Sequence, residues 1–342
     1  MTHISPAPIE IHNATLIDLP LVRRLTERGV ILESELSYTR EVTVGTQTTW
    51  LANLILPQRS VCTLVAKSGK LATVAHLRFK TDDHLAQIVM LAPNLEEDVN
   101  DTLLMHLLDG IAVESGRRGA HILTAEVNEN SPLFVTMRQS GFAVYARQEI
   151  WRLQGTVNEV PALSGELAQE TDDDTMDIQL LYSNIVPRLV QPITVPSRDS
   201  DGWVYRLGGR VQGYIAVSEG KRGIYLMPFL HPDSLGREAV AIIANAIQLI
   251  QKSGRTPVYV CVRRYQDWLV DALRDLGFTQ WENQAVMVRH ITAGVRQPRF
   301  ATFERVLEAI PNAIQTPITR INKIVSVIRQ QIDKKIGSWN VG

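Results

Sequence analysis

Groups that transfer protons stand in two neighbouring apolar runs in the first half of the chain. Glu126 lies near the end of the run 122–127, and His84 and Gln87 lie in the run before it, residues 84–91. A carboxylate or an imidazole held beside a reacting group can take its proton, directly or through water. Glu126 suits that role if its side chain faces a cleft, and a solvated position on the strand is the alternative.

Two tyrosines, Tyr265 and Tyr145, carry hydroxyl groups that can protonate a leaving group. For both, a place in the core or at its rim is the alternative. Other chemistries have no pattern in the sequence, because the Cys and His residues lack the spacing of a metal site and no nucleophile elbow or P-loop occurs. The sequence therefore predicts acid–base chemistry without a metal ion.

An internal repeat supplies the elements that position these residues. A strand, a long helix, a second strand, a short helix and a closing strand occur twice in the same order, about 137 residues apart. The first copy is predicted at residues 87–93, 98–114, 122–127, 132–139 and 146–153. The second copy is predicted at residues 224–231, 239–251, 258–262, 265–276 and 285–290. The chain is therefore expected to be a tandem of two related α/β units.

The segments in front of the two copies differ. Before the first copy the sequence predicts a strand at 9–15, helices at 19–28 and 48–56, and a hairpin of 61–66 and 71–79. Before the second copy it predicts one helix, from Asp174 or Thr175 to about residue 188, and a hairpin of 203–207 and 210–217. The second copy thus has a shortened front end. Residues 155–174, which show no periodicity, are expected to form a solvated linker.

Charge separates the end of the chain from the rest. The chain has 342 residues and a net charge of −1, but from residue 293 onward eight Lys or Arg stand against three Asp or Glu. After Pro317 an apolar stripe at helical spacing predicts a basic amphipathic tail. We expect this tail to pack on the protein's own sheet, on a second copy or on a partner. The alternative is a membrane surface, for which Trp339 supplies the interfacial aromatic.

Composition bounds the class of protein and its surroundings. With 45% hydrophobic and 21% charged residues, the chain has an ordinary globular composition. No amino-terminal run has the charged-then-apolar form expected of a signal peptide, and no apolar run approaches the ~18 residues that a membrane span needs. Cys62 and Cys261 lie in apolar runs and are expected to be buried free thiols. We expect a cytoplasmic protein with no transmembrane segment and no nucleic-acid partner.

The repeated order of elements resembles the GNAT (Gcn5-related N-acetyltransferase) fold. Gly213 resembles the family's glycine in the third strand, and residues 231–237, HPDSLGR, resemble the family's HP-(D/E)-x-x-G-(R/K) entry to the coenzyme loop. Asn130 followed by Gly141-Phe142, and Gly277-Phe278 in the second copy, resemble the closing "N…GF" pattern of the fold. The resemblance covers residues 9–153 and 177–291.

The resemblance implies an α/β fold with a mixed sheet, built as two acyl-CoA N-acyltransferase-like domains in tandem. The expected boundaries are 1–154 for the first domain, 155–174 for the linker, 175–292 for the second domain and 293–342 for the tail.

The resemblance also implies a place for acetyl-CoA or another acyl-CoA. In the family the coenzyme lies between the two central parallel strands, and backbone N–H groups of a glycine-rich loop at the start of the long helix hold its pyrophosphate. The residues that match are Gly236, Arg237, Glu238 and Ala239 in the second copy and Asn130 in the first. Glu238 and Val240 replace glycine-type positions, and residues 93–98 of the first copy contain no glycine. Both loops are therefore degenerate.

The function that the resemblance implies is an N-acyltransferase acting on an amine of a small molecule or peptide. Glu126 and His84 would then be candidates for the base. Tyr265 would be a candidate for the acid, since the family's tyrosine position holds Met137 in the first copy and Leu273 in the second. The competing hypothesis is a non-catalytic tandem that serves as a scaffold or binds a ligand, because a fold does not settle a function.

Overall fold

The computed structural model of the chain describes residues 8–40, 60–80, 84–95, 101–193, 201–251 and 254–291. All described residues belong to one compact unit, which lies within residues 1–293. The predicted helix at 48–56, the acids at 96–98 and the amphipathic tail lie outside the described residues.

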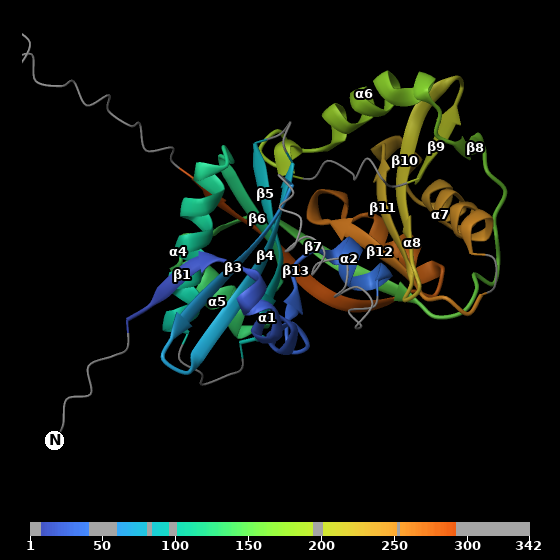
Figure 1. Cartoon of the computed structure of the whole chain (residues 1–342). Coiled ribbons are helices and arrows are strands. Elements are labelled where there is room, and N and C mark those ends of the chain that lie inside the picture. The colour runs from blue at the N-terminus through green and yellow to red at the C-terminus, as the bar shows by residue number, and fades with distance from the viewer. Residues whose placement is uncertain are drawn as a thin grey trace, which may run out of the picture. The chain divides into compact units, whose positions relative to one another are not determined.

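The first half of this unit contains the elements predicted for the first copy and a few short additions (Figure 1). Its strands are β1 Glu10–Asn13, β2 Val30–Ile31, β3 Val61–Ser68, β4 Leu71–Lys80, β5 Leu85–Ala92, β6 Ile122–Asn128 and β7 Ala143–Leu153. Its helices are η1 Leu16–Asp18, α1 Leu19–Thr26, α2 Ser34–Thr39, α4 Thr102–Arg117 and α5 Pro132–Gln139. The short elements η1, β2 and α2 are the ones in this half that the sequence did not predict.

The second half follows the same plan. Its strands are β8 Glu166–Gln169, β9 Asp201–Leu207, β10 Arg210–Glu219, β11 Ile224–Leu230, β12 Val258–Arg263 and β13 Thr279–His290. Its helices are η2 Asp172–Asp174, α6 Thr175–Ile185, η3 Gln191–Ile193, η4 Pro232–Ser234, α7 Arg237–Ile250, η5 Arg264–Gln266 and α8 Leu269–Asp275. The predicted repeat of strand, long helix, strand, short helix and closing strand is confirmed.

Helices cover both faces of the sheet because successive strand residues point to opposite sides. Leu64 of β3 packs in the core formed with α4, whereas its neighbour Val65 packs in the cluster formed with α1. In the second half Ile215 of β10 packs in the core under α7 and α8, and Tyr214 packs with α6. The long helices are held by apolar residues at a spacing of three and four, such as Ile243 and Ile247 of α7, which puts one face on the sheet.

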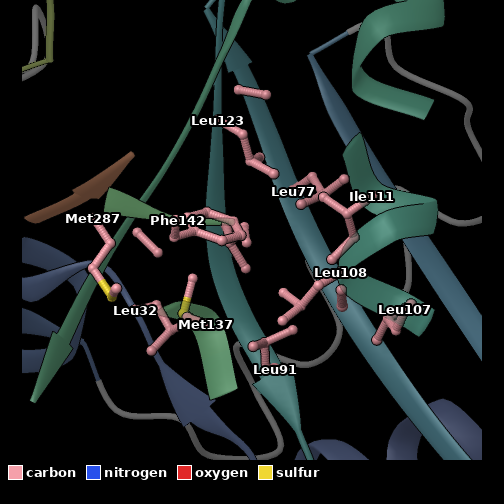
Figure 2. Packing of buried hydrophobic residues seen from close by; sticks show 14 of the residues in the cluster. Leu32, Leu77, Leu91, Leu107, Leu108, Ile111, Leu123, Met137, Phe142 and Met287 are labelled. Atoms are coloured by element: carbon pink, nitrogen blue, oxygen red, sulfur yellow. The ribbon is translucent and has the colours of Figure 1, made fainter. Parts of the chain in front are cut away.

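The two halves share one sheet because they exchange their closing strands. The strand order is β1-β3-β4-β5-β6-β13-β7-β12-β11-β10-β9-β8. β13 pairs with β6 of the first half, β7 pairs with β12 of the second half, and β7 and β13 pair with each other, all antiparallel (Figure 1). Met287 of β13 is accordingly buried in the first half's core, among residues such as Leu32 and Phe142 (Figure 2).

The front end of the second half is more complete than the sequence predicts. β8 pairs with β9, as β1 pairs with β3. The Asp174 carboxylate accepts bonds from the backbone and hydroxyl of Thr171, as Asp18 does from Thr15. The prediction of one helix and no strand in front of the second copy is therefore wrong at β8. A four-residue strand with two exposed and two half-buried side chains carries too weak an alternation to be recognised.

Residues 155–165 pack along α7, and the prediction of a solvated linker is wrong for this stretch. Gln251 Nε2 donates to Gly155 O at 2.9 Å, and Asn245 Nδ2 donates to Pro161 O at 2.9 Å. Valines and a leucine of the segment pack against the core under α7. Side chains of the helix hold the segment through its carbonyl groups, so it needs no periodicity of its own.

Candidate active site

In the second half the parallel strands β11 and β12 diverge, and the space between their carboxyl ends, the second groove, is occupied by a side chain. The two parallel strands pair at three positions, the last of them Leu226 with Val260. β11 then continues to Leu230 and β12 to Arg263 without further pairing, so the strands diverge towards their carboxyl ends. This is the place where the GNAT resemblance puts the coenzyme.

The side chain of Gln266 fills this groove. Its amide nitrogen lies 3.3 Å from Pro228 O and its amide oxygen lies 3.2 Å from Leu230 N, with the amide oriented to satisfy both groups. Gln266 is 3% exposed. One carboxamide therefore binds two backbone groups of β11, Pro228 O and Leu230 N, beyond the point where β11 pairs with β12.

The start of α7 presents backbone N–H donors close to the carboxyl end of β11. Gly236 is the N-cap, with φ 71° and open space around its α-carbon. In an α-helix the first N–H groups, here those of Arg237, Glu238 and Ala239, have no intrahelical acceptor, and the helix dipole adds partial positive charge. The arrangement can bind an anion such as a phosphate group.

Glu238 places a carboxylate at the same helix start, and its neighbours satisfy it. Ser164 donates from its hydroxyl to Glu238 Oε2 at 2.6 Å and from its N–H to Oε1 at 3.1 Å, and the Tyr205 hydroxyl donates to Oε1. Burial opposes ionisation, but these bonds hold the pKa of Glu238 below its usual value. Burial and the bond to Glu238 raise the pKa of Tyr205 to about 12. The charge of Glu238 remains close to the donors of the first turn.

The corresponding groove in the first half is filled by main chain. β5 and β6 pair in parallel at three positions, the last of them Gln87 with Thr124. Beyond that point β2 pairs with β5, Leu32 N donates to Val89 O at 2.8 Å, and Glu126 N donates to Leu32 O at 3.0 Å. The segment from β2 to Leu32 thus forms hydrogen bonds to both diverging strands, and Leu32 is 1% exposed.

Glu126 is engaged by two partners. Its Oε2 accepts from Ser34 N at 2.7 Å, at the start of α2, and its Oε1 lies 3.4 Å from Nη2 of Arg263 in β12. Arg263 is 4% exposed. The carboxylate therefore links α2, β6 and the second half of the sheet.

The structure does not bring His84 or Asn130 to Glu126. His84 precedes β5 at the amino end of the strand, where its ring stacks on His121 with centroids 4.8 Å apart. Glu126 lies towards the carboxyl end of the neighbouring parallel strand β6. Asn130 lies in the turn after β6, where its N–H donates to Asn128 Oδ1 at 2.8 Å. The three residues therefore occupy separate places.

Tyr265 lines a cavity of about 320 Å³ beside the second groove. Its other walls come from β7 and from the segment after α6, and include Ala146, Pro187, Val190 and Arg264. Tyr145 lines it too, and its hydroxyl is bonded to His290 Nε2. The sequence did not indicate the walls at Pro187 and Val190, because these residues lie in an aperiodic segment.

Arg264 connects this cavity with a second one. It lines both the cavity beside Tyr265 and a cavity of about 360 Å³ whose lining includes Glu129, Glu149 and Asp267. Arg147 of β7 also lines both, and its Nε donates to Glu129 Oε1 at 2.7 Å. Strand exchange builds these cavities, since β7 of the first half lies against β12 of the second.

Metal and thiol chemistry have no support in the part of the chain that the structure describes. No group of three or more His, Cys, Asp or Glu side chains there is placed to hold a metal ion. Cys62 and Cys261 are free and buried, and burial raises the pKa of each thiol to about 11. Both therefore remain protonated and unreactive near neutral pH.

Comparison with family models and with curated proteins finds no match to this chain. Solved structures do resemble it. A GCN5-related N-acetyltransferase from Sphaerobacter thermophilus has a TM-score of 0.50 at 11% identity, over 83% of this chain and 96% of its own. A tandem GNAT protein from the clavulanic acid biosynthesis pathway has a TM-score of 0.51 at 13% identity, over 83% and 99%. A candidate acetyltransferase from Pyrococcus horikoshii has a TM-score of 0.51 at 11% identity, over 82% and 89%.

These likenesses extend over both halves of the described chain and agree with the diverging parallel strands beside each long helix. At this level of identity they establish the fold alone. The expectation from the repeat is thus confirmed: the chain has the tandem GNAT fold.

Proposed function

We propose that the chain is an N-acyltransferase that uses acetyl-CoA or another acyl-CoA, and that its second half holds the coenzyme. The observation that carries the proposal is the groove between β11 and β12 together with the donors at the start of α7. A helix start can hold the pyrophosphate, and a groove between diverging strands can hold the arm that carries the thioester. The first half, whose groove main chain fills, is assigned a structural role.

The acceptor is a small-molecule amine in the cavity beside Tyr265, since its volume of about 320 Å³ lies in the range of small-ligand sites. In the reaction the amine nitrogen attacks the thioester carbon, so a C–N bond forms and the C–S bond breaks. The amine loses a proton, and the departing thiolate gains one. Tyr265, two residues after the end of β12, is our candidate for the group that protonates the thiolate.

Glu126 is proposed as a structural residue, because Ser34 and Arg263 already occupy its carboxylate. His84 receives no catalytic role in this proposal, since it lies at the opposite end of the strands. A peptide amine as acceptor, the cytoplasm as location and a role of the tail in self-association remain predictions. The buried free thiols Cys62 and Cys261 suit a reducing compartment. In the described residues no helix is long and apolar enough to cross a membrane.

Calorimetric titration with acetyl-CoA tests the proposal. Gly236→Asp adds a side chain and a negative charge at the helix start, so we expect the dissociation constant to rise at least about tenfold. Gly119→Asp is the matched control, because Gly119 also has a left-handed backbone, φ 89°, and open surroundings, but lies after α4 in the first half. Equal affinity in both variants, or binding abolished only by the Gly119 change, would remove the second half as the site.

The alternative is a non-catalytic tandem that serves as a scaffold. The observation in its favour is that both grooves are filled by the chain itself, by β2 with Leu32 in one half and by Gln266 in the other. A scaffold would show no heat of binding and no thermal shift with acetyl-CoA, whereas a ligand at ~100 times its dissociation constant adds ~2.7 kcal/mol of stability.

A further inference from the structure

The two grooves are filled in different ways. In the first half a stretch of main chain lies between β5 and β6 and forms hydrogen bonds to both. In the second half a single side chain, Gln266, bonds to β11. A main-chain segment between two strands can leave the groove only if the hydrogen bonds of the local sheet are broken and formed anew. A side chain can leave the groove by rotation about its own bonds.

Pro228 lowers the number of backbone groups that need a partner in the second groove. Residues 228 and 230 of β11 direct their backbone groups to the same side, and proline has no N–H. The open side of β11 therefore has no donor at residue 228, and the groups that Gln266 binds are the acceptor Pro228 O and the donor Leu230 N. The primary amide of Gln266 has an acceptor and donors at one end and binds both. Because the site is almost fully buried, neither group can go without a partner at low cost.

The pantetheine arm of an acyl-CoA carries the same kind of groups. It has two secondary amides separated by a two-carbon spacer, and each amide is trans, with its N–H and C=O on opposite sides. A single trans amide therefore cannot direct both its N–H and its C=O towards β11. Two amides can, if one directs its N–H and the other its C=O towards the strand. These would bond to Pro228 O and Leu230 N in place of Gln266.

We propose that Gln266 occupies the pantetheine place in the unliganded chain and is displaced when the coenzyme binds, so that residue 266 sets the affinity for acyl-CoA. This inference rests on the proposed binding of acyl-CoA in the second half. Gln266 ends the three-residue η5, directly after Tyr265, and its side chain would leave the groove by rotation about its own bonds.

Calorimetric titration of the full chain with acetyl-CoA, and separately with pantetheine, tests the inference. Gln266→Ala removes the competing amide, and we expect the dissociation constant for both ligands to fall about tenfold. Gln251→Ala is the matched control. Gln251 also uses its amide to bond two backbone groups, Gly155 O and Thr256 O, but at the far end of α7. The Gln251→Ala variant should bind acetyl-CoA with the same affinity as the unchanged chain.

Hydrogen exchange at the Leu230 amide provides a second readout. We expect the amide to be protected in the unchanged chain, to exchange faster in Gln266→Ala, and to be protected again when acetyl-CoA is bound. Should Gln266→Ala fail to fold, Gln266→Asn, whose shorter side chain cannot reach both groups, gives the same comparison.

The outcomes separate this inference from the proposed function. An unchanged or weaker affinity in Gln266→Ala, with the unchanged chain still binding acetyl-CoA, overturns the displacement and leaves the proposed function in place. Binding of acetyl-CoA by Gln266→Ala but not by the unchanged chain supports the inference, and would mean that Gln266 blocks the coenzyme completely. Absence of binding in the unchanged chain and in both variants overturns the proposed function and this inference with it.

Discussion

Glu126 of β6 and Arg263 of β12 form an ion pair that joins the two halves of the sheet, with Arg263 Nη2 3.4 Å from Glu126 Oε1. The side chain of Arg263 is 4% exposed and that of Glu126 is 14% exposed. A buried guanidinium is costly unless a partner compensates its charge. Glu126 is therefore the group that allows Arg263 to lie at the junction of the halves, and it also holds the start of α2 through Ser34.

Replacement of Glu126 tests this structural role. Glu126→Gln leaves Arg263 buried beside a neutral amide, and we expect the free energy of unfolding to fall by about 3 kcal/mol. Urea unfolding followed by circular dichroism measures the change. The exposed pair of Arg274 and Asp271 is the control, because Asp271→Asn should change stability by less than about 0.5 kcal/mol. A stable Glu126→Gln variant that has lost acyl transfer would instead identify Glu126 as the base.

Asp18 and Asp174 predict how stability depends on pH. Burial opposes ionisation of Asp18, but hydrogen bonds from Lys67 and Thr15 hold its pKa well below the usual range. The bond from Arg206 is the main cause of the lowered pKa of Asp174. A carboxyl whose pKa falls on folding stabilises the folded state above the unfolded pKa, near 4, and this stabilisation is lost as the pH drops through the folded value.

Unfolding in urea between pH 7 and pH 3 checks the sign of this effect. We expect stability to decline below about pH 5, and to decline less steeply in Asp18→Asn and Asp174→Asn, which lack the titrating group. At pH 7 each variant should be about 1 kcal/mol less stable, since a capping box is lost. Asp173→Asn, at an exposed neighbour of Asp174, should change neither the stability at pH 7 nor the steepness of its decline below about pH 5.

Periodic elements could be predicted from the sequence, whereas contacts made by one residue or two could not. The apolar spacing in α4 and α7 indicated both long helices, and the repeat indicated the fold. The exchange of β7 and β13 was not predictable, because an alternating strand shows which face is buried and not which strand lies beside it. β2 has only two residues, and Gln266 resembles any polar residue of a turn. The residues that fill the two grooves therefore could not be recognised from the sequence.

Tyr265 should matter to the chemical step if it protonates the leaving thiolate. We expect Tyr265→Phe to lower kcat about 100-fold while the dissociation constant for acetyl-CoA changes little, because the proton is needed only as the C–S bond breaks. Release of free thiol measures the rate, and calorimetry measures binding. Tyr145→Phe, in the wall of the same cavity, is the control and should retain its rate. Equal loss in both variants would indicate a packing role for Tyr265.

The carboxylate of Glu238 should weaken the binding of a pyrophosphate at the start of α7. Glu238→Gln removes the negative charge and keeps a polar group for Ser164, so we expect the dissociation constant for acetyl-CoA to fall about threefold at low salt. The gain should shrink at high salt, because screening weakens the repulsion in the unchanged chain. Pantetheine, which lacks the pyrophosphate, should bind both chains equally. A gain for pantetheine as well would place the effect of residue 238 elsewhere than at the phosphates.

Strand exchange predicts that neither half folds without the other. Ending the chain after Phe278 removes β13, which leaves β6 and β7 with unpaired edges and takes Met287 out of the first half's core. We expect this chain to aggregate, because exposed strand edges and apolar core surface both promote association. Ending the chain after residue 292 keeps every described strand and should leave the far-ultraviolet circular dichroism of the folded part intact. A soluble, cooperatively unfolding chain that ends at Phe278 would mean that β7 can close the first half alone, by pairing with β6 as in an unexchanged unit.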